Sequence, residues 1–124
     1  MYQVIAIAGG GAIGALLRFW LSTGVYQWLG RGFPWGTLVV NVLGSFLMGL
    51  LFVLFMERGL VSTEVRAAVL VGFLGSLTTF STFSMETLTL IEQASYLKAL
   101  LNAMASLLVC LLACWAGLIF GRQL

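Results

Sequence analysis

Histidine is absent from this sequence of 124 residues, and other residue types that support chemistry are scarce. Six basic and four acidic residues make up 8% of the chain and leave a net charge of +2. Without histidine and with so few carboxylates, no nucleophile–base pair or catalytic metal cluster can be assembled, so we do not expect an enzyme. The small, dispersed positive charge also argues against nucleic acid as a partner.

Cysteine and proline are nearly absent as well. The two cysteines, Cys110 and Cys114, lie one helical turn apart in an apolar stretch. Without histidine or a CxxC motif they support neither a zinc site nor a redox pair, and packing as small apolar residues is the simpler interpretation. The one proline, Pro34, suits the first turn of a helix that begins near Trp35.

Apolar residues are abundant: 61% of the chain is hydrophobic, and the mean hydropathy is +1.10. A soluble domain of this size needs more charge to cover its surface. About 20 apolar residues cross the hydrocarbon core of a membrane as a helix. The stretches that meet this length are approximately Val4–Leu29, Trp35–Met56, Val65–Ile91 and Leu97–Phe120. We therefore expect an all-α membrane protein with a single four-helix transmembrane domain over residues 1–124 and no extramembrane domain.

Short connections between these stretches make consecutive helices antiparallel. The basic residues that flank four such spans are Arg58, Arg66 and Arg122 on one side of the membrane, and Arg31 and Lys98 on the other. This bias is weak, and a weak bias permits insertion in both directions. Two interpretations stay open: a chain that inserts both ways and pairs as an antiparallel homodimer, or a chain with one fixed orientation.

Glycine spacing predicts close helix contacts. Gly10 and Gly14 form a GxxxG pattern in the first stretch, and Ser45 and Gly49 form a similar small pair in the second. Small residues at this spacing let helix backbones approach each other, so they indicate packing rather than function.

The stretch "GFLGSLTTFSTFSMET" (Gly72–Thr87) departs from its apolar surroundings by its many hydroxyls. Gly72 and Gly75 weaken a helix here, and Ser and Thr compete for backbone hydrogen bonds. Unwound backbone at membrane depth needs protein, water or an ion as a partner, so we expect a break whose carbonyls suit a small hard cation. Hydroxyls beyond the break, Ser81 and Thr82 among them, would line a hydrated path.

Two phenylalanines, Phe80 and Phe83, lie among these hydroxyls. Aromatic rings have a positive edge, which offers an anion weak attraction if it faces a pathway. The alternative is that both rings face lipid or pack against other side chains, as most phenylalanines in membranes do.

Amide and hydroxyl groups recur deep in two other spans. Asn41 has an amide that can donate two hydrogen bonds, which suits an anion; a bond to a backbone carbonyl of another helix is an equally good interpretation. Asn102, Ser106 and Cys110 step by four residues and form one weakly polar stripe on a helix. On its own, this stripe favours hydrogen bonding between helices over a pathway.

Three motifs together resemble the CrcB/Fluc family of bacterial fluoride channels. "GFLGSLTTFSTFSMET" is similar to the family's third-helix signature, and its central part is highly specific. "GTLVVNVLGSF" (Gly36–Phe46) resembles the second-helix motif, and "GGGAIGALLRFW" (Gly9–Trp20) resembles the glycine–arginine pattern of the first helix. The resemblance covers the whole chain, with the same number of spans.

The resemblance implies an antiparallel, dual-topology homodimer in the bacterial plasma (inner) membrane, with two pores that are each built from both subunits. It implies fluoride-selective, passive export of cytoplasmic fluoride, which lowers its concentration and toxicity. A structural Na⁺ that is not transported would lie on the dimer axis. Gly75 and Thr78 match the positions whose backbone carbonyls hold that ion.

Other residues match the family's pathway. Phe80 and Phe83 match the two phenylalanines whose ring edges face fluoride, and Asn41 matches the asparagine whose amide binds it. The polar track on the fourth helix would consist of Asn102, Ser106 and Cys110. Cys110 is a weak substitute for the hydroxyl that relatives usually carry. Arg18 and Glu86 match buried charged residues to which we assign vestibule electrostatics and structure.

A small multidrug-resistance-type, proton-coupled exporter is the main alternative, because such proteins also have four spans and often form antiparallel dimers. That mechanism needs a carboxylate in the first helix, where this chain carries Arg18 instead. Glu86 is the only deep carboxylate, and it lies beyond the phenylalanine pair. A structural or assembly subunit would explain the glycines but not the hydroxyl-rich stretch.

Overall fold

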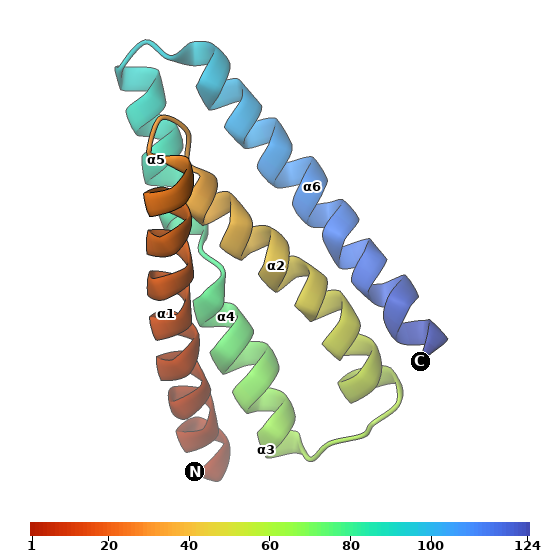
Figure 1. The fold of residues 1–124 in the computed structure, drawn as a ribbon. Coiled ribbons are helices and arrows are strands. Elements are labelled where there is room, and N and C mark those ends of the chain that lie inside the picture. The colour runs from red at the N-terminus through yellow and green to blue at the C-terminus, as the bar shows by residue number, and fades with distance from the viewer.

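The computed structural model describes all 124 residues, and helices account for nearly the whole chain. The elements are α1 (Tyr2–Leu29), α2 (Trp35–Phe52), the π-helical segment η1 (Val53–Glu57), α3 (Thr63–Arg66), the π-helical segment η2 (Ala67–Phe73), α4 (Leu74–Leu77), α5 (Phe80–Glu92) and α6 (Tyr96–Gln123). These elements are joined by short connections, as Figure 1 shows. The expected all-α architecture is confirmed.

Four helical segments are long and apolar enough to cross a membrane. They are Tyr2–Leu29, Trp35–Glu57, Thr63–Glu92 and Tyr96–Gln123. Their ends lie within a few residues of those expected from the sequence. The chain is a multi-pass membrane protein.

The spans are arranged around α2, with α1 on one side and α6 on the other (Figure 1). η2 and α4 pack against α1 and α2, whereas α5 lies at the other end of the molecule beside the start of α6. The N-terminus, the connection after η1 and the C-terminus share one end of the molecule. The connections after α1 and α5 share the opposite end, as expected for antiparallel neighbours.

Glycines let α1 pack directly on η2. A side chain at Gly10 would overlap the carbonyl of Ala68, and one at Gly14 would overlap the carbonyl of Phe73. The close contact expected from Gly10 and Gly14 is therefore confirmed. Gly72 contributes from the other side, because a Cβ there would overlap the carbonyl of Ile7. Gly72 lies within the π-helical segment η2, so the chain stays helical there, and the glycine allows this close packing.

The contact between α2 and α6 uses glycines from both helices. Gly49 lies against the carbonyl of Cys114, and Gly117 lies against the carbonyl of Phe46. Gly121 continues the same face of α6, with a prospective Cβ 3.1 Å from the carbonyl oxygen of Leu50. The sequence analysis identified Gly49 but missed its partners on the fourth span.

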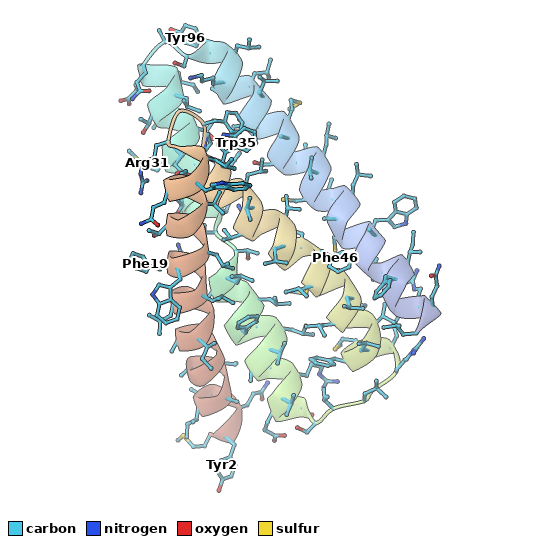
Figure 2. All side chains as sticks on the ribbon, viewed as in Figure 1. Tyr2, Phe19, Arg31, Trp35, Phe46 and Tyr96 are labelled. Atoms are coloured by element: carbon cyan, nitrogen blue, oxygen red, sulfur yellow. The ribbon has the colours of Figure 1, made fainter.

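Large apolar side chains cover the outside of the molecule. Only 17 of the 124 residues are buried, and the fully buried side chains are few and mostly apolar. Phe19 is 61% exposed and points away from α1 in Figure 2. An exterior of this kind is suited to lipid or to another apolar protein surface, as expected for membrane-spanning helices.

Two residues between α4 and α5 have extended backbone. Thr78 has φ −90° and ψ 155°, and Thr79 has φ −150° and ψ 122°. Gly75, which the sequence suggested as a weak point, lies within α4. The non-helical residues are thus the two threonines that follow it.

Alanine at Gly117 should destabilise the fold. Its Cβ would overlap the Phe46 carbonyl and lie 2.8 Å from the Leu50 nitrogen, so α2 and α6 must separate. We expect Gly117→Ala to lower the free energy of unfolding by about 1–3 kcal/mol, measured by SDS titration in mixed micelles. Gly24→Ala is the matched control, because nothing lies within 4 Å of its Cβ position. Equal stability of both variants would contradict this account of the contact.

Candidate functional site

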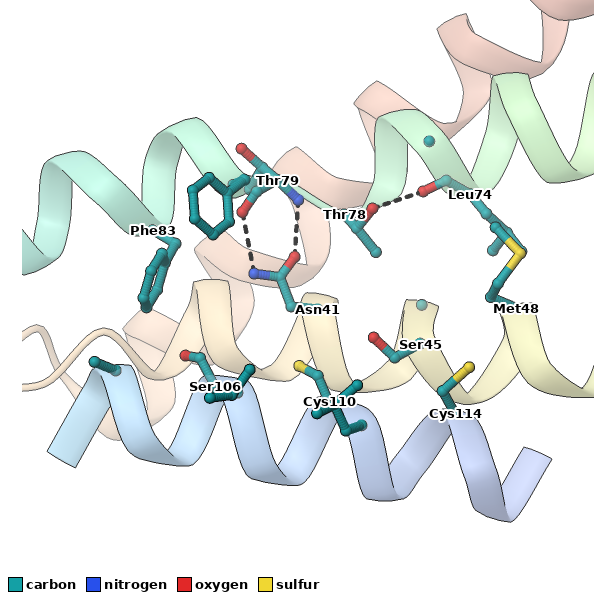
Figure 3. A pocket seen from close by; sticks show the side chains of 16 residues that line it. Asn41, Ser45, Met48, Leu74, Thr78, Thr79, Phe83, Ser106, Cys110 and Cys114 are labelled. Carbon is teal, nitrogen blue, oxygen red and sulfur yellow. Dashed lines mark hydrogen bonds between the residues drawn. The ribbon is translucent and has the colours of Figure 1, made fainter. Parts of the chain in front are cut away.

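A groove with a volume of about 560 Å³ runs between the third span and the pair α2 and α6. Its lining residues are Asn41, Gly44, Ser45, Met48, Leu74, Gly75, Thr78, Thr79, Phe80, Phe83, Ala103, Ser106, Leu107, Cys110, Leu111 and Cys114. No charged residue is among them. Figure 3 shows the groove with the third span on one side and α6 on the other. It brings together most of the residues that the sequence indicated, from three separate spans.

Asn41 binds the backbone of the extended segment. Its Nδ2 donates to the carbonyl of Thr79 at 3.1 Å, and its Oδ1 accepts from the N–H of Thr79 at 2.8 Å (Figure 3). A primary amide has two N–H groups, so one hydrogen of Nδ2 remains for another acceptor. Of the two interpretations of Asn41, the bond to a backbone carbonyl is therefore present, and it leaves one donor in the groove.

Pairing with Asn41 changes which carbonyls of the third span are free. In a continuous helix the N–H of Thr79 would donate to the carbonyl of Gly75, four residues earlier. The N–H of Thr78 makes the usual helical bond to the carbonyl of Leu74, at 3.1 Å, and its hydroxyl donates to the same carbonyl at 3.0 Å. Neither threonine N–H reaches Gly75, and the carbonyl of Thr78 accepts no hydrogen bond. The carbonyl oxygens of Gly75 and Thr78 are thus left available beside the extended segment.

Arg18 also serves this segment. Its Nε donates to the carbonyl of Ser76 at 2.9 Å, across from α1 to the last turn of α4. Carbonyls in the last turn of a helix lack partners within the helix. Arg18 therefore supplies a donor to the end of α4, a role that the sequence analysis did not foresee.

Thr79 caps the start of α5. Its hydroxyl oxygen accepts from the N–H of Thr82 at 3.2 Å and lies 3.3 Å from the hydroxyl of Ser81. It also donates to the hydroxyl of Thr82 at 3.1 Å. Ser81 and Thr82 were expected beside a pathway; within one chain they lie in the first turn of α5 and do not line the groove.

The two phenylalanines begin α5 and form one end of the groove. The rings of Phe80 and Phe83 have centroids 5.3 Å apart and planes tilted by 40°. Phe80 is 79% exposed, whereas Phe83 is partly buried. Both rings line the groove, and the outer one is free to contact a partner or lipid.

The polar stripe on α6 divides into two parts. Ser106 and Cys110 line the groove, but Asn102 does not. Asn102 is 2% exposed and donates to the hydroxyl of Thr87 at 2.8 Å. Its Oδ1 accepts from the hydroxyl of Ser106 at 3.5 Å. Within one chain Asn102 thus links α5 to α6 and contacts the groove only through Ser106.

Glu86 lies away from the groove, at a second cavity of about 200 Å³. Its Oε2 accepts from the hydroxyl of Tyr26 at 2.6 Å, whereas its Oε1 is buried without a partner. The guanidinium of Arg31 lies over the ring of Tyr26, 4.5 Å from its centroid. Arg18 and Glu86 therefore belong to two different places, although the sequence analysis grouped them.

Several groove residues carried no signal in the sequence analysis. Thr79 was counted only as one of many hydroxyl residues. In the structure its carbonyl, its N–H and its hydroxyl all form hydrogen bonds. Cys114 was interpreted as a small apolar packing residue and Met48 was not singled out, yet both line the groove. Helical spacing gives a possible signal for Cys114, because it continues the step of four from Ser106 and Cys110.

Comparison with known proteins places the chain in a family. Residues 5–118 match the family model described as "CrcB-like protein, Camphor Resistance (CrcB)". The chain is 60% identical over 122 residues to a protein of Methylococcus capsulatus named "Fluoride-specific ion channel FluC". That match covers 98% of the chain but 54% of the relative, so the chain spans about half of that protein's length.

Relatives of similar length carry the same name. One from Magnetococcus marinus is 58% identical, over 97% of the chain and 98% of its own length. One from Geobacter sulfurreducens is 48% identical over the full length of both. These names describe ion channels, which are not enzymes, in line with the expectation from composition. The family match over most of the chain, together with these relatives, shows that the chain belongs to the CrcB-like family.

Proposed function

We propose that the chain is the subunit of a fluoride-selective channel that lets cytoplasmic fluoride leave a bacterial cell passively, across the inner membrane. The names of the relatives support this substrate. The observation that carries the proposal is the chemistry of the groove, which is lined by an amide, hydroxyls, thiols, two phenylalanines and aliphatic side chains without any charged side chain. Such a lining replaces water around an anion without trapping it by a fixed positive charge.

Asn41 is the central donor in this proposal. Its amide is held by Thr79, so its orientation is fixed before an anion arrives. The Nδ2 hydrogen not used by Thr79 is the group that would bind fluoride. A donor that is already oriented loses little conformational freedom on binding, which favours rapid entry and release.

Phe80, Phe83, Ser106 and Cys110 continue the proposed path on either side of Asn41. The positive edges of the two rings offer weak attraction to a partly dehydrated anion. Ser106 has a hydroxyl donor, and Cys110 has a weaker thiol donor. Within one chain that hydroxyl donates to Oδ1 of Asn102, so it must leave this bond before it can donate to an anion. Ser81 and Thr82 remain candidates for the path at the start of α5.

The complete channel would be an antiparallel homodimer with two pores, each formed by both subunits. Phe80 supports this arrangement, because it begins the groove wall yet is 79% exposed within one chain. A second chain would cover that ring and complete the wall beside it. The weak difference in basic residues between the two sides of the membrane supports insertion in both directions.

A structural Na⁺ fits the free carbonyls of the third span. The carbonyl of Thr78 accepts no hydrogen bond, and that of Gly75 receives none from Thr78 or Thr79. Na⁺ is a hard cation that prefers oxygen ligands, so two carbonyls from each of two subunits would suit it. The third span would then be a broken helix whose unpaired groups the ion satisfies. The ion would join the subunits and add a fixed positive charge between the pores.

The exporter alternative gains little support from the geometry. Glu86 is the only carboxylate deep in the chain, and it lies outside the groove. A proton-coupled exchange needs a carboxylate where substrate binds.

Replacement of either phenylalanine should slow fluoride passage. Purified protein in liposomes should release fluoride, measured with a fluoride electrode, and should retain chloride. We expect Phe80→Ile or Phe83→Ile to reduce the fluoride rate at least tenfold, because an aliphatic side chain lacks the positive ring edge. Phe19→Ile is the control, since Phe19 is an exposed residue of α1 outside the groove. Equal release of chloride, or wild-type rates in both groove variants, would contradict the proposal.

Removal of Na⁺ should stop conduction without any mutation. We expect liposomes prepared with N-methylglucamine in place of Na⁺ to lose fluoride release, and return of Na⁺ to restore it. The physical reason is that carbonyls of Gly75 and Thr78 left without a partner destabilise the dimer contact. Dimer content, followed by chemical cross-linking, should fall in parallel. Full fluoride release in the absence of Na⁺ would refute the ion site.

Dual insertion should be visible in cells. A reporter active only in the cytoplasm and one active only in the periplasm, each fused after Leu124, should both give signal. Addition of Lys residues to one terminus should shift the ratio, because loop charge sets orientation. Signal from a single reporter would show a fixed orientation and would exclude an antiparallel dimer of identical chains.

A further inference from the structure

α5 carries both phenylalanines of the groove, yet little of it is packed inside the chain. Leu90 is its only buried residue. Several of its serine and threonine hydroxyls donate to the carbonyl four residues earlier in the same helix. Only Glu86 and Thr87 form side-chain hydrogen bonds with other spans. These two neighbours therefore provide the lateral hydrogen bonds that hold α5 to the rest of the chain.

Tyr26 is the partner of α5 on the Glu86 side. Its hydroxyl donates to Oε2 of Glu86 at 2.6 Å and lies 3.3 Å from the hydroxyl oxygen of Thr37 in α2. The tyrosine ring lies directly against the first turn of α2, since a Cβ at Gly36 would overlap it, and the guanidinium of Arg31 lies over the ring. Because Oε1 of Glu86 is buried without a partner, Tyr26 is the one hydrogen-bond partner of this carboxylate.

Asn102 is the partner of α5 on the Thr87 side. This amide of α6 is 2% exposed, and its Nδ2 donates to the hydroxyl oxygen of Thr87 at 2.8 Å. The same hydroxyl donates to the carbonyl of Phe83 at 2.7 Å. A hydroxyl that accepts and donates at once is held in one orientation. Two hydrogen bonds in series thus connect α6 to the backbone of Phe83.

The two lateral bonds reach one turn of α5 from different directions, because successive residues of an α-helix are about 100° apart. Figure 1 shows α5 at the end of the molecule where α1 ends and α6 begins. Phe83 lies about one turn earlier, three residues before Glu86 and four before Thr87, and such spacings place side chains on one face. We call the bonds Tyr26–Glu86 and Asn102–Thr87 the α5 brace. Two points of attachment fix both the position and the rotation of this turn.

We propose that Tyr26 and Thr87 are positioning residues, which set the place of the Phe83 ring in the groove through α5. This inference rests on the proposed fluoride function, because a ring edge attracts an anion only if it faces the path. Loss of either bond frees one side of the turn, so α5 can rotate or shift while the chain stays folded. Neither residue lines the groove, so both act through Phe83 rather than by touching the ion.

Hydrogen exchange tests the α5 brace without any measurement of transport. Exchange of the protein in lipid nanodiscs is followed by mass spectrometry for each span, because it reports local opening. We expect Thr87→Val and Tyr26→Phe to speed exchange within residues 80–92 at least threefold and to leave α1 and α2 unchanged. Thr89→Val is the matched control for the first variant, since the Thr89 hydroxyl bonds only its own helix. Tyr2→Phe is the control for the second, since Tyr2 is 80% exposed.

Fluoride release from liposomes then tests positioning. We expect Thr87→Val and Tyr26→Phe to slow release at least threefold, and both control variants to keep the wild-type rate. Thr87→Ser retains the hydroxyl and should keep at least half of that rate. This rescue separates positioning from a general loss of packing, because serine fills less space than valine and would be the worse variant if packing alone mattered.

The possible failures are distinguishable. Equal exchange in test and control variants, or faster exchange in every span, would overturn the α5 brace. Faster exchange of α5 with unchanged release, or equal slowing by Thr87→Ser and Thr87→Val, would overturn positioning. Each arm has its own test variant, so Tyr26→Phe still decides if Thr87→Val fails to fold. Absence of release from the unmodified protein would refute the fluoride function, while hydrogen exchange would still decide the brace.

Discussion

Backbone hydrogen bonding at Thr78 and Thr79 is the constraint on which the rest of the site depends. In hydrocarbon an unpaired N–H or C=O costs on the order of several kcal/mol, so extended residues within a span need partners from elsewhere. Asn41 provides both partners for Thr79, and Arg18 binds the carbonyl of Ser76 just before it. α1 and α2 are thereby tied to the third span at its least regular point. Asn41, which the sequence suggested as a binding residue, therefore also holds the extended backbone of Thr79 in place.

The same constraint positions the groove. Because α4 ends at Leu77, α5 starts anew at Phe80, with Thr79 as its cap. This restart places both phenylalanine rings at the groove end, opposite the stripe of α6 that carries Ser106 and Cys110. Asn41 lies between these walls. The donors and ring edges of the proposed path are therefore held by helix ends and packing glycines rather than by flexible loops.

Hydropathy was sufficient to predict the four spans, because crossing a membrane depends on each segment alone. Gly10 and Gly14 were interpretable for a similar reason, since a spacing of four on one helix defines a face. The contacts that the sequence did not predict are those between different helices. The separation of Glu86 from Arg18, the burial of Asn102 against Thr87 and the entry of Cys114 into the groove all require the relative positions of two spans. Asn41 was left with two interpretations, and its amide makes the bond to backbone while keeping one N–H that an anion could accept.

Neutrality of the groove has two consequences that follow from the same lining. In the proposed path an anion would meet donors without a fixed positive charge, so it would bind through directed hydrogen bonds that are easily exchanged. A hard cation meets neither carboxylate nor imidazole and gains little. In a groove without charged side chains, the donors and acceptors that line it, rather than a net electrostatic potential, decide which ion is bound. The charged side chains of Glu86 and Arg31 line the second cavity instead of this groove.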